Sequence, residues 1–490
     1  MTTAPVQTFS QIIDQFTELP AWLAFSGDAE NIASLLRNSV PELVSGALTL
    51  SAGPFKRMEI KDKAGCWGET YVFNVAGANR APQTLLLEAA LYAPNVPLPA
   101  NIDASGTGPF GSPGWRGWFP EQRLLLTYQH PDQNRLPEPP LADPNQARPL
   151  LEQALRKQAE GYADVQIESC IVSTSEYEPG ATTVYRYQLT YAASQADRSW
   201  HTMIFAKYFP EDDQEKAENL YTGMRSLWHS PLAHSNAATI AEPLGYIAEL
   251  RTVLQGPVSE QCNLEEIERE AVQNNDPAAW DKLTKYVRKA AIGLAALHQS
   301  GVQHTKHFAL KKLRGNVTKQ IEYLSAPFPE LMQGIERIVT QVDHVLATTA
   351  ADPEVPSHGG FRPEQVLING EQIGFIDFER FSMSEPSYDV YRFRTELMDY
   401  GCSVRHHNYP DQATLRDRMA KLVAINEIFL QAYESLTPIS RQRLALWETL
   451  HYLREVLLTW SKARLEDRTG RILMLEAHLQ ALGINGSIES

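Results

Sequence analysis

The sequence has no excess of basic residues. It contains 44 Lys and Arg against 59 Asp and Glu, which gives a formal net charge of −15. Proteins that bind nucleic acid or anionic membrane surfaces attract them with a positive field. We therefore expect no nucleic acid and no membrane among the partners of this chain.

Cysteine is equally scarce. Cys66, Cys170, Cys262 and Cys402 lie far apart, and no C-x-x-C pair is present. This spacing favours neither a zinc site nor a disulfide framework. Reduced thiols are typical of the cytoplasm.

Long hydrophobic runs are also missing. No apolar stretch approaches the roughly 18 residues that suggest a membrane-spanning helix. The first residues, MTTAPVQTFSQIIDQF, lack the basic and apolar regions of a signal peptide. We therefore expect a cytoplasmic protein.

The chain is long enough for more than one domain. A length of 490 residues predicts two or three domains. Strand-like pieces at 69–75 and 83–87 follow helical segments. A proline-rich stretch at 131–144 marks the end of this N-terminal part. These features predict an N-terminal α+β module over residues 1–150, which we expect to offer a surface to a protein partner.

The remainder divides into a strand-rich part and a helical part. Residues 161–255 alternate apolar and polar as strands do, most clearly at 183–191 and 202–209. A helix is expected at 213–228 within this part. Helices dominate residues 256–485, interrupted by the segment 356–393.

The segment 356–393 contains a hairpin that ends in a carboxylate. Apolar residues at 366–368 and 373–376 flank Asn369-Gly370, which predicts a hairpin with a type I′ turn. Asp377 follows the second strand and is held rigidly there. A carboxylate in this position suits a Mg²⁺ ligand, whereas an isolated Ile-Asp-Phe would more often cap a surface strand.

The segment 356–393 as a whole resembles the catalytic motif of the aminoglycoside phosphotransferase and choline kinase superfamily. The family pattern is His-Gly-Asp, then Pro, then Asn, then a strand ending in Ile-Asp-Phe/Trp-Glu, then Asp-Pro and a later Asp. The corresponding residues here are His358, Gly359, Gly360, Pro363, Gln365, Ile376, Asp377, Phe378, Glu379, Glu385, Pro386 and Asp389. The resemblance implies an α+β, two-lobed protein-kinase-like fold: residues 161–255 form a small β-rich lobe and residues 256–485 a large helical lobe.

The resemblance also assigns roles to residues of the segment. Asp377 and Gln365 stand at the metal-binding positions, while His358 and Asp389 support the catalytic loop. Gly360 stands where the family has its catalytic Asp, and Gln365 replaces Asn. A glycine cannot act as a base, so we expect either a weakened site or a substitute acid, with Glu364 and Glu379 as candidates.

Nucleotide binding is expected to involve the strand-rich part. Lys207, in the strand MIFAKYF, is the predicted phosphate-binding lysine, although a strand lysine is usually solvated. The kinase pattern implies a glutamate partner from the next helix, and Glu218 is preferred over Glu215. Gly180 lies in the Pro-Gly turn at the position of the loop that covers the nucleotide, where a plain hairpin turn is the simpler interpretation.

Two functions follow from these expectations. The first is ATP- and Mg²⁺-dependent phosphorylation of a hydroxyl group on a small molecule, such as a sugar, amino sugar or amino alcohol. The second is a pseudokinase, which binds nucleotide or a protein partner without transferring phosphate. The matching Lys207 and Asp377 favour nucleotide binding in both cases.

Overall fold

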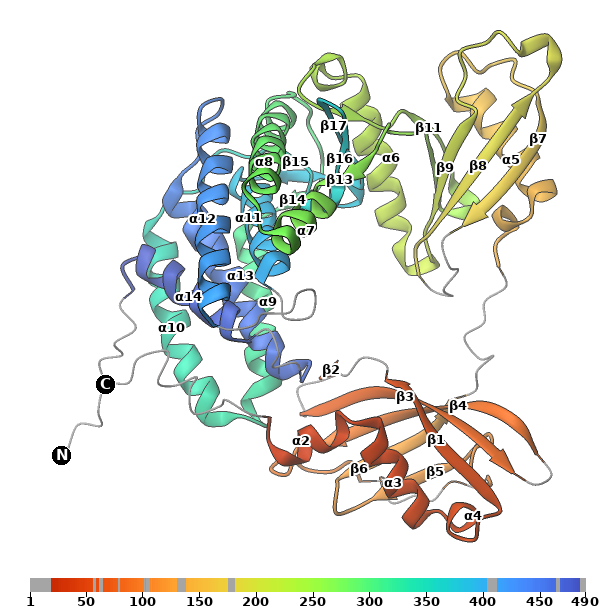
Figure 1. Cartoon of the computed structure of the whole chain (residues 1–490), viewed down its shortest axis with the longest axis vertical. Helices are drawn as coiled ribbons and strands as arrows, with labels where there is room; N and C mark the ends of the chain where they lie inside the picture. Colours follow the sequence, from red (N-terminus) through yellow and green to blue (C-terminus); the bar gives the residue numbers. More distant parts are fainter. Residues whose placement is uncertain are drawn as a thin grey trace. The chain divides into compact units, whose positions relative to one another are not determined.

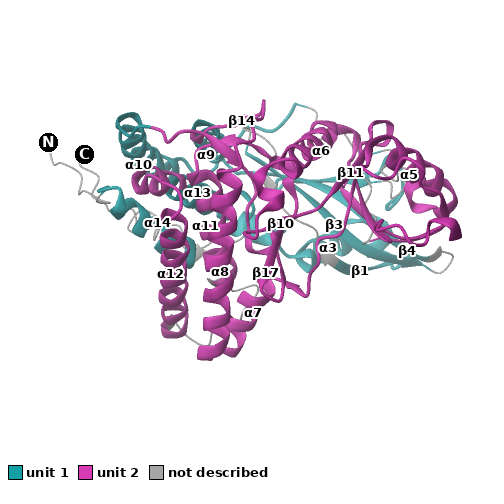
Figure 2. Cartoon of the chain, turned by 90° about the horizontal axis from the view of Figure 1, so that it is seen from above, with its two compact units in different colours: residues 1–135, 311–350, 448–490 teal, residues 136–310, 351–447 magenta. Residues whose placement is uncertain are grey.

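The computed structural model describes residues 19–55, 59–60, 65–77, 80–100, 102, 106, 108–129, 138–174, 181–402, 412–463 and 468–484. The chain divides into two compact units (Figure 2). The first comprises residues 1–135, 311–350 and 448–490, and the second comprises residues 136–310 and 351–447.

The first unit contains a six-stranded antiparallel sheet in the order β1-β3-β4-β6-β5, with β2 paired to β3 (Figure 1). The strands are β1 (Leu48–Phe55), β2 (Glu59–Ile60), β3 (Cys66–Gly77), β4 (Arg80–Tyr92), β5 (Arg116–Phe119) and β6 (Leu124–Gln129). In β3, Tyr71, Phe73 and Val75 are buried on one face, because alternate residues of a strand point to the same side. This alternation gives the sheet its core face.

Helices complete the first unit. They are α2 (Ala21–Ser26), α3 (Ala29–Ser39), α4 (Pro41–Val44), α9 (Leu310–Ser325) from its second residue, α10 (Pro329–Thr348), the part of α13 (Arg441–Ser461) from residue 448, and α14 (Arg468–Ala481). Helix α3 packs on β1. The ring of Trp67 meets that of Phe328 edge-on, at 6.2 Å between centroids, so the turn before α10 contacts the sheet.

The second unit begins with a five-stranded antiparallel sheet in the order β11-β12-β9-β8-β7. Its strands are β7 (Ile167–Thr174), β8 (Thr183–Tyr191), β9 (Met203–Tyr208), β11 (Pro243–Ile247) and β12 (Thr252–Gln255). Helix α6 (Gln214–Trp228) follows β9. The predicted strands at 183–191 and 202–209 and the helix at 213–228 are therefore confirmed.

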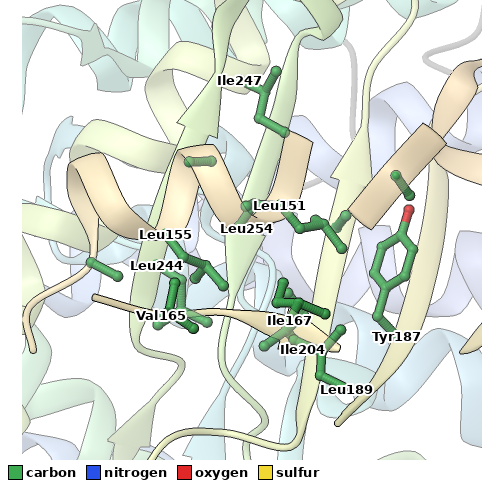
Figure 3. Close-up of a cluster of buried hydrophobic side chains, with 14 of the residues drawn as sticks. Leu151, Leu155, Val165, Ile167, Tyr187, Leu189, Ile204, Leu244, Ile247 and Leu254 are labelled. Atoms are coloured by element: carbon green, nitrogen blue, oxygen red, sulfur yellow. The ribbon is translucent and has the colours of Figure 1, made fainter. Parts of the chain in front are cut away.

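The sheet of the second unit is covered by α5 (Pro144–Gln158), of which sequence analysis assigned residues 144–150 to the N-terminal module. Leu151 and Leu155 on this helix are fully buried against Tyr187 and Ile204 of the sheet (Figure 3). The Tyr187 hydroxyl also donates to the carbonyl of Leu141, at 2.6 Å. The boundary therefore falls near residue 135, since α5 buries its apolar face on this sheet.

Helices and two small sheets form the rest of the second unit. The helices are α7 (Leu264–Asn274), α8 (Pro277–His298), α11 (Ser387–Cys402), α12 (Gln412–Glu434) and α13 as far as residue 447. One sheet has the order β10-β17-β16-β13 and the other β14-β18-β15. Their strands are β10 (Thr239–Ile240), β13 (Cys262–Asn263), β14 (His307–Phe308), β15 (Val355–Ser357), β16 (Val366–Asn369), β17 (Gln372–Phe375) and β18 (Ser382–Ser384).

This arrangement is the predicted α+β fold, with a β-rich lobe followed by a helical lobe. Sequence analysis also placed residues 311–350 and 448–485 in the large lobe, whereas the division into compact units assigns them to the first unit. None of the described helices is long and apolar enough to cross a membrane.

The predicted hairpin is confirmed, but its turn is not type I′. Asn369 pairs with Gln372, which leaves Gly370 and Glu371 as the two loop residues. Of these, only Gly370 has a positive φ, +56°. A single positive φ at the first loop position is the pattern of a type II′ turn, whereas type I′ needs positive φ at both.

Candidate functional site

Asp377 occupies a strained position at the end of β17. Its backbone is left-handed, with φ 72° and ψ 53°, and it caps the short 3₁₀ helix η8 (Phe378–Arg380). A residue other than glycine adopts this conformation at a cost of about 1 kcal/mol or more, and such strain is concentrated at functional sites. The twist in the chain turns the Asp377 carboxylate out of the strand.

Lys207 forms ion pairs with two carboxylates of this segment. Its Nζ lies 2.5 Å from Oδ1 of Asp377 and 3.1 Å from Oε2 of Glu379. Burial alone would lower the pKa of Lys207, but the two carboxylates outweigh it and raise that pKa. Burial likewise opposes ionisation of Asp377, yet Lys207 holds its pKa below the usual range. Both groups are therefore charged at neutral pH.

Gln365 contacts the other oxygen of Asp377. It belongs to the 3₁₀ helix η7 (Pro363–Gln365), is 4% exposed, and donates from Nε2 to Oδ2 of Asp377 at 3.1 Å. Its amide oxygen is buried and has no hydrogen-bond partner in the described part of the chain. Gln365, which was predicted as a metal ligand, therefore contacts the Asp377 carboxylate through its amide nitrogen and keeps its amide oxygen without a partner among the described residues.

Asp389 lies beneath the segment and is fully buried. Its carboxylate oxygens accept hydrogen bonds from the backbone N–H groups of His358 and Gly359, at 2.6 and 2.8 Å. His298 Nε2 lies 3.1 Å from the same carboxylate, and its Nδ1 lies 2.6 Å from the Tyr433 hydroxyl. These contacts hold the backbone immediately before Gly360.

His358 connects the loop to the end of the strand. Its side chain is buried, and Nε2 lies 2.8 Å from the carbonyl oxygen of Ile376. Because a carbonyl only accepts hydrogen bonds, Nε2 carries the proton. Burial lowers the pKa of His358 below the ordinary value, so the ring is neutral. His358 therefore holds Asp377 in place without adding charge.

The two glycines of the loop have different steric surroundings. Gly359 has a φ of +83°, and a Cβ there would overlap the carbonyl oxygen of Arg380. At Gly360, by contrast, a Cβ would come no closer than 3.8 Å to the amide of Gln365. The backbone therefore leaves room for a side chain at the position where the family has Asp.

The predicted pairing of Lys207 with Glu218 is wrong in this structure. Glu218 is exposed and accepts a hydrogen bond from Gln214 on its own helix, at 2.9 Å. Glu215 pairs with Lys306 at 3.0 Å. Neither glutamate lies on the face of α6 that packs toward the site.

Asn219 of α6 forms hydrogen bonds with the catalytic segment. It donates from Nδ2 to the carbonyl oxygens of Glu379 and Phe381, each at 2.9 Å. Helix and segment approach closely at Gly223, where a Cβ would lie 2.8 Å from the Phe381 ring. The buried polar residue inside an amphipathic helix was the signal that sequence analysis missed.

The remaining predicted residues lie in different places. Glu364 forms an ion pair with Arg362, and its side chain is 43% exposed. Glu379 faces Lys207, as described above. Gly180 lies outside the described residues.

A cavity of about 390 Å³ joins the small lobe to the catalytic segment. Its apolar walls include Val184, Phe205 and Leu367, and its polar lining includes Lys207 and Asp377. Gln365 and Glu364 also line it, as do Gln255 at the end of β12 and the following Gly256. Apolar walls with a few convergent polar groups are typical of small-molecule sites.

A smaller cavity of about 60 Å³ lies beside Gly360. Asp377 and Glu379 line it together with Arg362, Arg380 and Arg392. Sequence analysis did not identify these arginines, because they show no common spacing: Arg362 precedes η7, Arg380 ends η8 and Arg392 lies in α11.

Comparison with known proteins supports the predicted relationship. Residues 264–447 match the family model described as the phosphotransferase enzyme family. This match confirms, over that part of the chain, the resemblance carried by the catalytic segment. No curated protein matches the chain.

Solved structures that match this chain include three proteins described as kinases or kinase family members. A choline/ethanolamine kinase family protein from Mesorhizobium loti has 14% identity and a TM-score of 0.41, covering 64% of this chain and 90% of its own. A choline kinase from Streptococcus pneumoniae has 14% identity and a TM-score of 0.38. The match covers 65% of this chain and 94% of the choline kinase. A glucosamine kinase solved with glucosamine, ADP and inorganic phosphate has 15% identity and a TM-score of 0.42. The match covers 93% of this chain and 100% of the glucosamine kinase.

Proposed function

We propose that this chain, whose residues 264–447 match the phosphotransferase enzyme family, transfers phosphate from ATP to a hydroxyl group of a small molecule. The observation that carries the proposal is the position of Lys207 and Asp377, 2.5 Å apart on the wall of one cavity. Phosphoryl transfer depends on positioning and charge neutralisation rather than covalent chemistry. A cation and a carboxylate at the end of an apolar cavity meet these needs.

The nucleotide would occupy the larger cavity. Its volume of about 390 Å³ lies within the usual range for ligand sites. The walls formed by Val184, Phe205 and Leu367 suit an adenine ring, and Lys207 at the polar end would attract the phosphates.

A magnesium ion fits the donor set beside Asp377. The carboxylate and the amide oxygen of Gln365, which is buried without a partner, are hard oxygen donors. These two side chains are the ligands that the protein would supply, and one or two protein ligands are usual for Mg²⁺. When bound, the ion would neutralise charge on the phosphates.

Glu379 is the acid best placed to substitute for the missing base. It lines the small cavity beside Gly360, whereas Glu364 lines the larger cavity. The ion pair with Lys207 fixes Glu379 beside Asp377. A proton leaving the substrate hydroxyl would pass to its carboxylate. General-base catalysis typically contributes about 10²- to 10⁴-fold, so this role is measurable.

A second function, that of a pseudokinase, is favoured by a different observation. Both oxygens of Asp377 are already satisfied, one by Lys207 and one by Gln365. Such a closed network stabilises the cleft without a ligand. In this case the protein would bind nucleotide, or a protein partner through residues 1–150, without phosphate transfer.

Two measurements on the full chain separate these functions. Calorimetry with ATP and Mg²⁺ reports nucleotide binding, and a screen of hydroxyl compounds for ADP release reports transfer. Binding with turnover supports the phosphotransferase, whereas binding without turnover on any compound supports the pseudokinase. No nucleotide binding at millimolar ATP would contradict the proposal.

A further inference from the structure

The small cavity beside Gly360 has an unusual charge pattern. Its volume of about 60 Å³ has room for a few water-sized groups, not for a whole sugar. The charged residues that line it are Arg362, Arg380, Arg392, Asp377 and Glu379. Three arginines therefore line the cavity together with two acidic residues.

The formal charges around this cavity balance, since Lys207 and the three arginines are matched by four carboxylates, those of Asp377, Glu379, Glu364 and Glu396. Asp377 and Glu379 share the ammonium group of Lys207, at 2.5 and 3.1 Å, so part of their charge is already neutralised. Outside the lining, Glu364 pairs with Arg362, and Glu396 pairs with Arg392 at 3.1 Å. None of these carboxylates forms an ion pair with Arg380 in the part of the chain that the structure describes.

Two of the arginines have unused hydrogen-bond donors. The side chain of Arg380 makes no hydrogen bond or ion pair with any residue that the structure describes. Arg362 has a buried Nε with no hydrogen-bond partner in the described part of the chain, although its Nη2 pairs with Glu364. Arg380 is exposed, so water can solvate its guanidinium group, whereas the buried Nε of Arg362 lacks an acceptor, which is costly. An acceptor group inside the cavity would remove this cost.

The glycine at position 360 keeps this cavity open. An aspartate here would project toward Arg380, whose Cδ lies 3.9 Å from the position of the Cβ. Its carboxylate would then satisfy the guanidinium from within the protein. With glycine, the same space is free for a carboxylate or phosphate that comes from a ligand.

We propose that the cavity beside Gly360 binds an oxyanion, held by Arg362, Arg380 and Arg392. Guanidinium groups match the planar, bidentate geometry of carboxylate and phosphate oxygens. The inference deepens the proposed function and rests on it in one respect, the position of the substrate hydroxyl beside Glu379 in this cavity. The acceptor would then be a hydroxyl compound that carries a carboxylate or a phosphate group.

The same oxyanion chemistry has two sources in such a site. One is the anionic group of the acceptor, and the other is the terminal phosphate of ATP. Comparing inorganic phosphate, ADP and ATP as probes distinguishes them, because ADP lacks the terminal phosphate.

The test measures binding of inorganic phosphate to the full chain by phosphorus NMR, with and without saturating ADP and Mg²⁺. Arg380→Gln should weaken phosphate binding by about tenfold or more, since a hydrogen bond to a charged group is lost. The control is Arg288→Gln, an equal change of charge at an exposed position of α8 outside the cavity. It should bind phosphate as the wild type does.

A second pair of variants isolates the charge inside the cavity. Gly360→Asp and Gly360→Asn add side chains of nearly equal size, but only Asp adds a carboxylate. Gly360→Asp should weaken phosphate binding by at least tenfold more than Gly360→Asn. Equal affinities in the two variants would overturn the proposal.

The probes then identify the source of the oxyanion. If Arg380→Gln weakens phosphate binding in the ADP-saturated protein and leaves ATP affinity unchanged, the acceptor supplies the oxyanion. If it weakens ATP binding but not ADP binding, the terminal phosphate supplies it. If phosphate, ADP and ATP all bind Arg380→Gln as they bind the wild type, the oxyanion site is disproved. Phosphate binding without any ADP binding would instead disprove the proposed function alone.

Discussion

The ammonium group of Lys207 and the carboxylate of Asp377 lie 2.5 Å apart, although 170 residues separate them in the sequence. Lys207 comes from β9 of the small lobe, and Asp377 follows β17 at the end of the catalytic hairpin. Their pairing brings the two lobes of the second unit together at one cleft. The charge state of the pair therefore affects both stability and ligand binding.

Magnesium and ATP should raise the melting temperature of the wild-type protein. A ligand at 100 times its Kd stabilises the native state by about 2.7 kcal/mol. Asp377→Ala should suppress this rise, because it removes the carboxylate that would hold the metal. Asp281→Ala, at an exposed position of α8, is the matched control and should retain the rise. An undiminished shift in Asp377→Ala would exclude a role for this carboxylate.

Glu379→Gln should lower phosphate transfer by about 10²-fold or more if Glu379 acts as the base. Glu364→Gln should change it by much less, because Glu364 pairs with Arg362 and does not line the cavity beside Gly360. The measurement is the initial rate of ADP release with a substrate that the wild-type protein phosphorylates. In the same assay Gly360→Asp should give no increase. A rise of about 100-fold in Gly360→Asp would instead identify the chain as a kinase that has simply lost its base.

Alanine at the two neighbouring glycines should have opposite effects. Gly359→Ala places a Cβ against the carbonyl of Arg380 at a φ of +83°, and should destabilise the protein by about 3 kcal/mol or more. Gly360→Ala meets no atom closer than 3.8 Å and should cost less than about 1 kcal/mol. Chemical denaturation measures both values. Equal costs would contradict the described loop geometry.

The stability of the protein should fall in mild acid partly because of His358. Burial lowers its pKa in the folded state, whereas the unfolded chain titrates near 6.5. Below about pH 6.5 the unfolded state therefore binds more protons, and stability decreases by at most about 1.4 kcal/mol per pH unit until the folded-state pKa is reached.

The matched variant for this prediction is His358→Gln, which has no group that titrates in this range. The difference in unfolding free energy between wild type and variant should shrink as the pH falls from 7 to 5. The other histidines are common to both proteins and cancel in the difference. A constant difference would show that His358 is not held neutral.

The sequence by itself was sufficient for features that depend on local pattern. Alternation of apolar residues predicted the strands at 183–191 and 202–209, because side chains of a strand point to opposite faces in turn. The spacing from His358 to Asp389 predicted the family resemblance, and a hairpin ending at Asp377 followed from the residues around Gly370. Each of these depends on residues that are close in the chain.

Tertiary structure decided which residues meet across the cleft. Helical periodicity predicts that α6 has a buried face, but not its rotation against the catalytic segment, and that rotation presents Asn219 rather than Glu218. In the same way, α5 packs on the small-lobe sheet because its leucines are buried against the apolar face of that sheet. Arg362 is near Gly360 in the chain, but Arg380 and Arg392 come from η8 and α11, so their proximity to it depends on packing. Local pattern therefore determined the elements and the catalytic segment, whereas docking of distant elements determined the partners of Lys207 and the charge of the cavity.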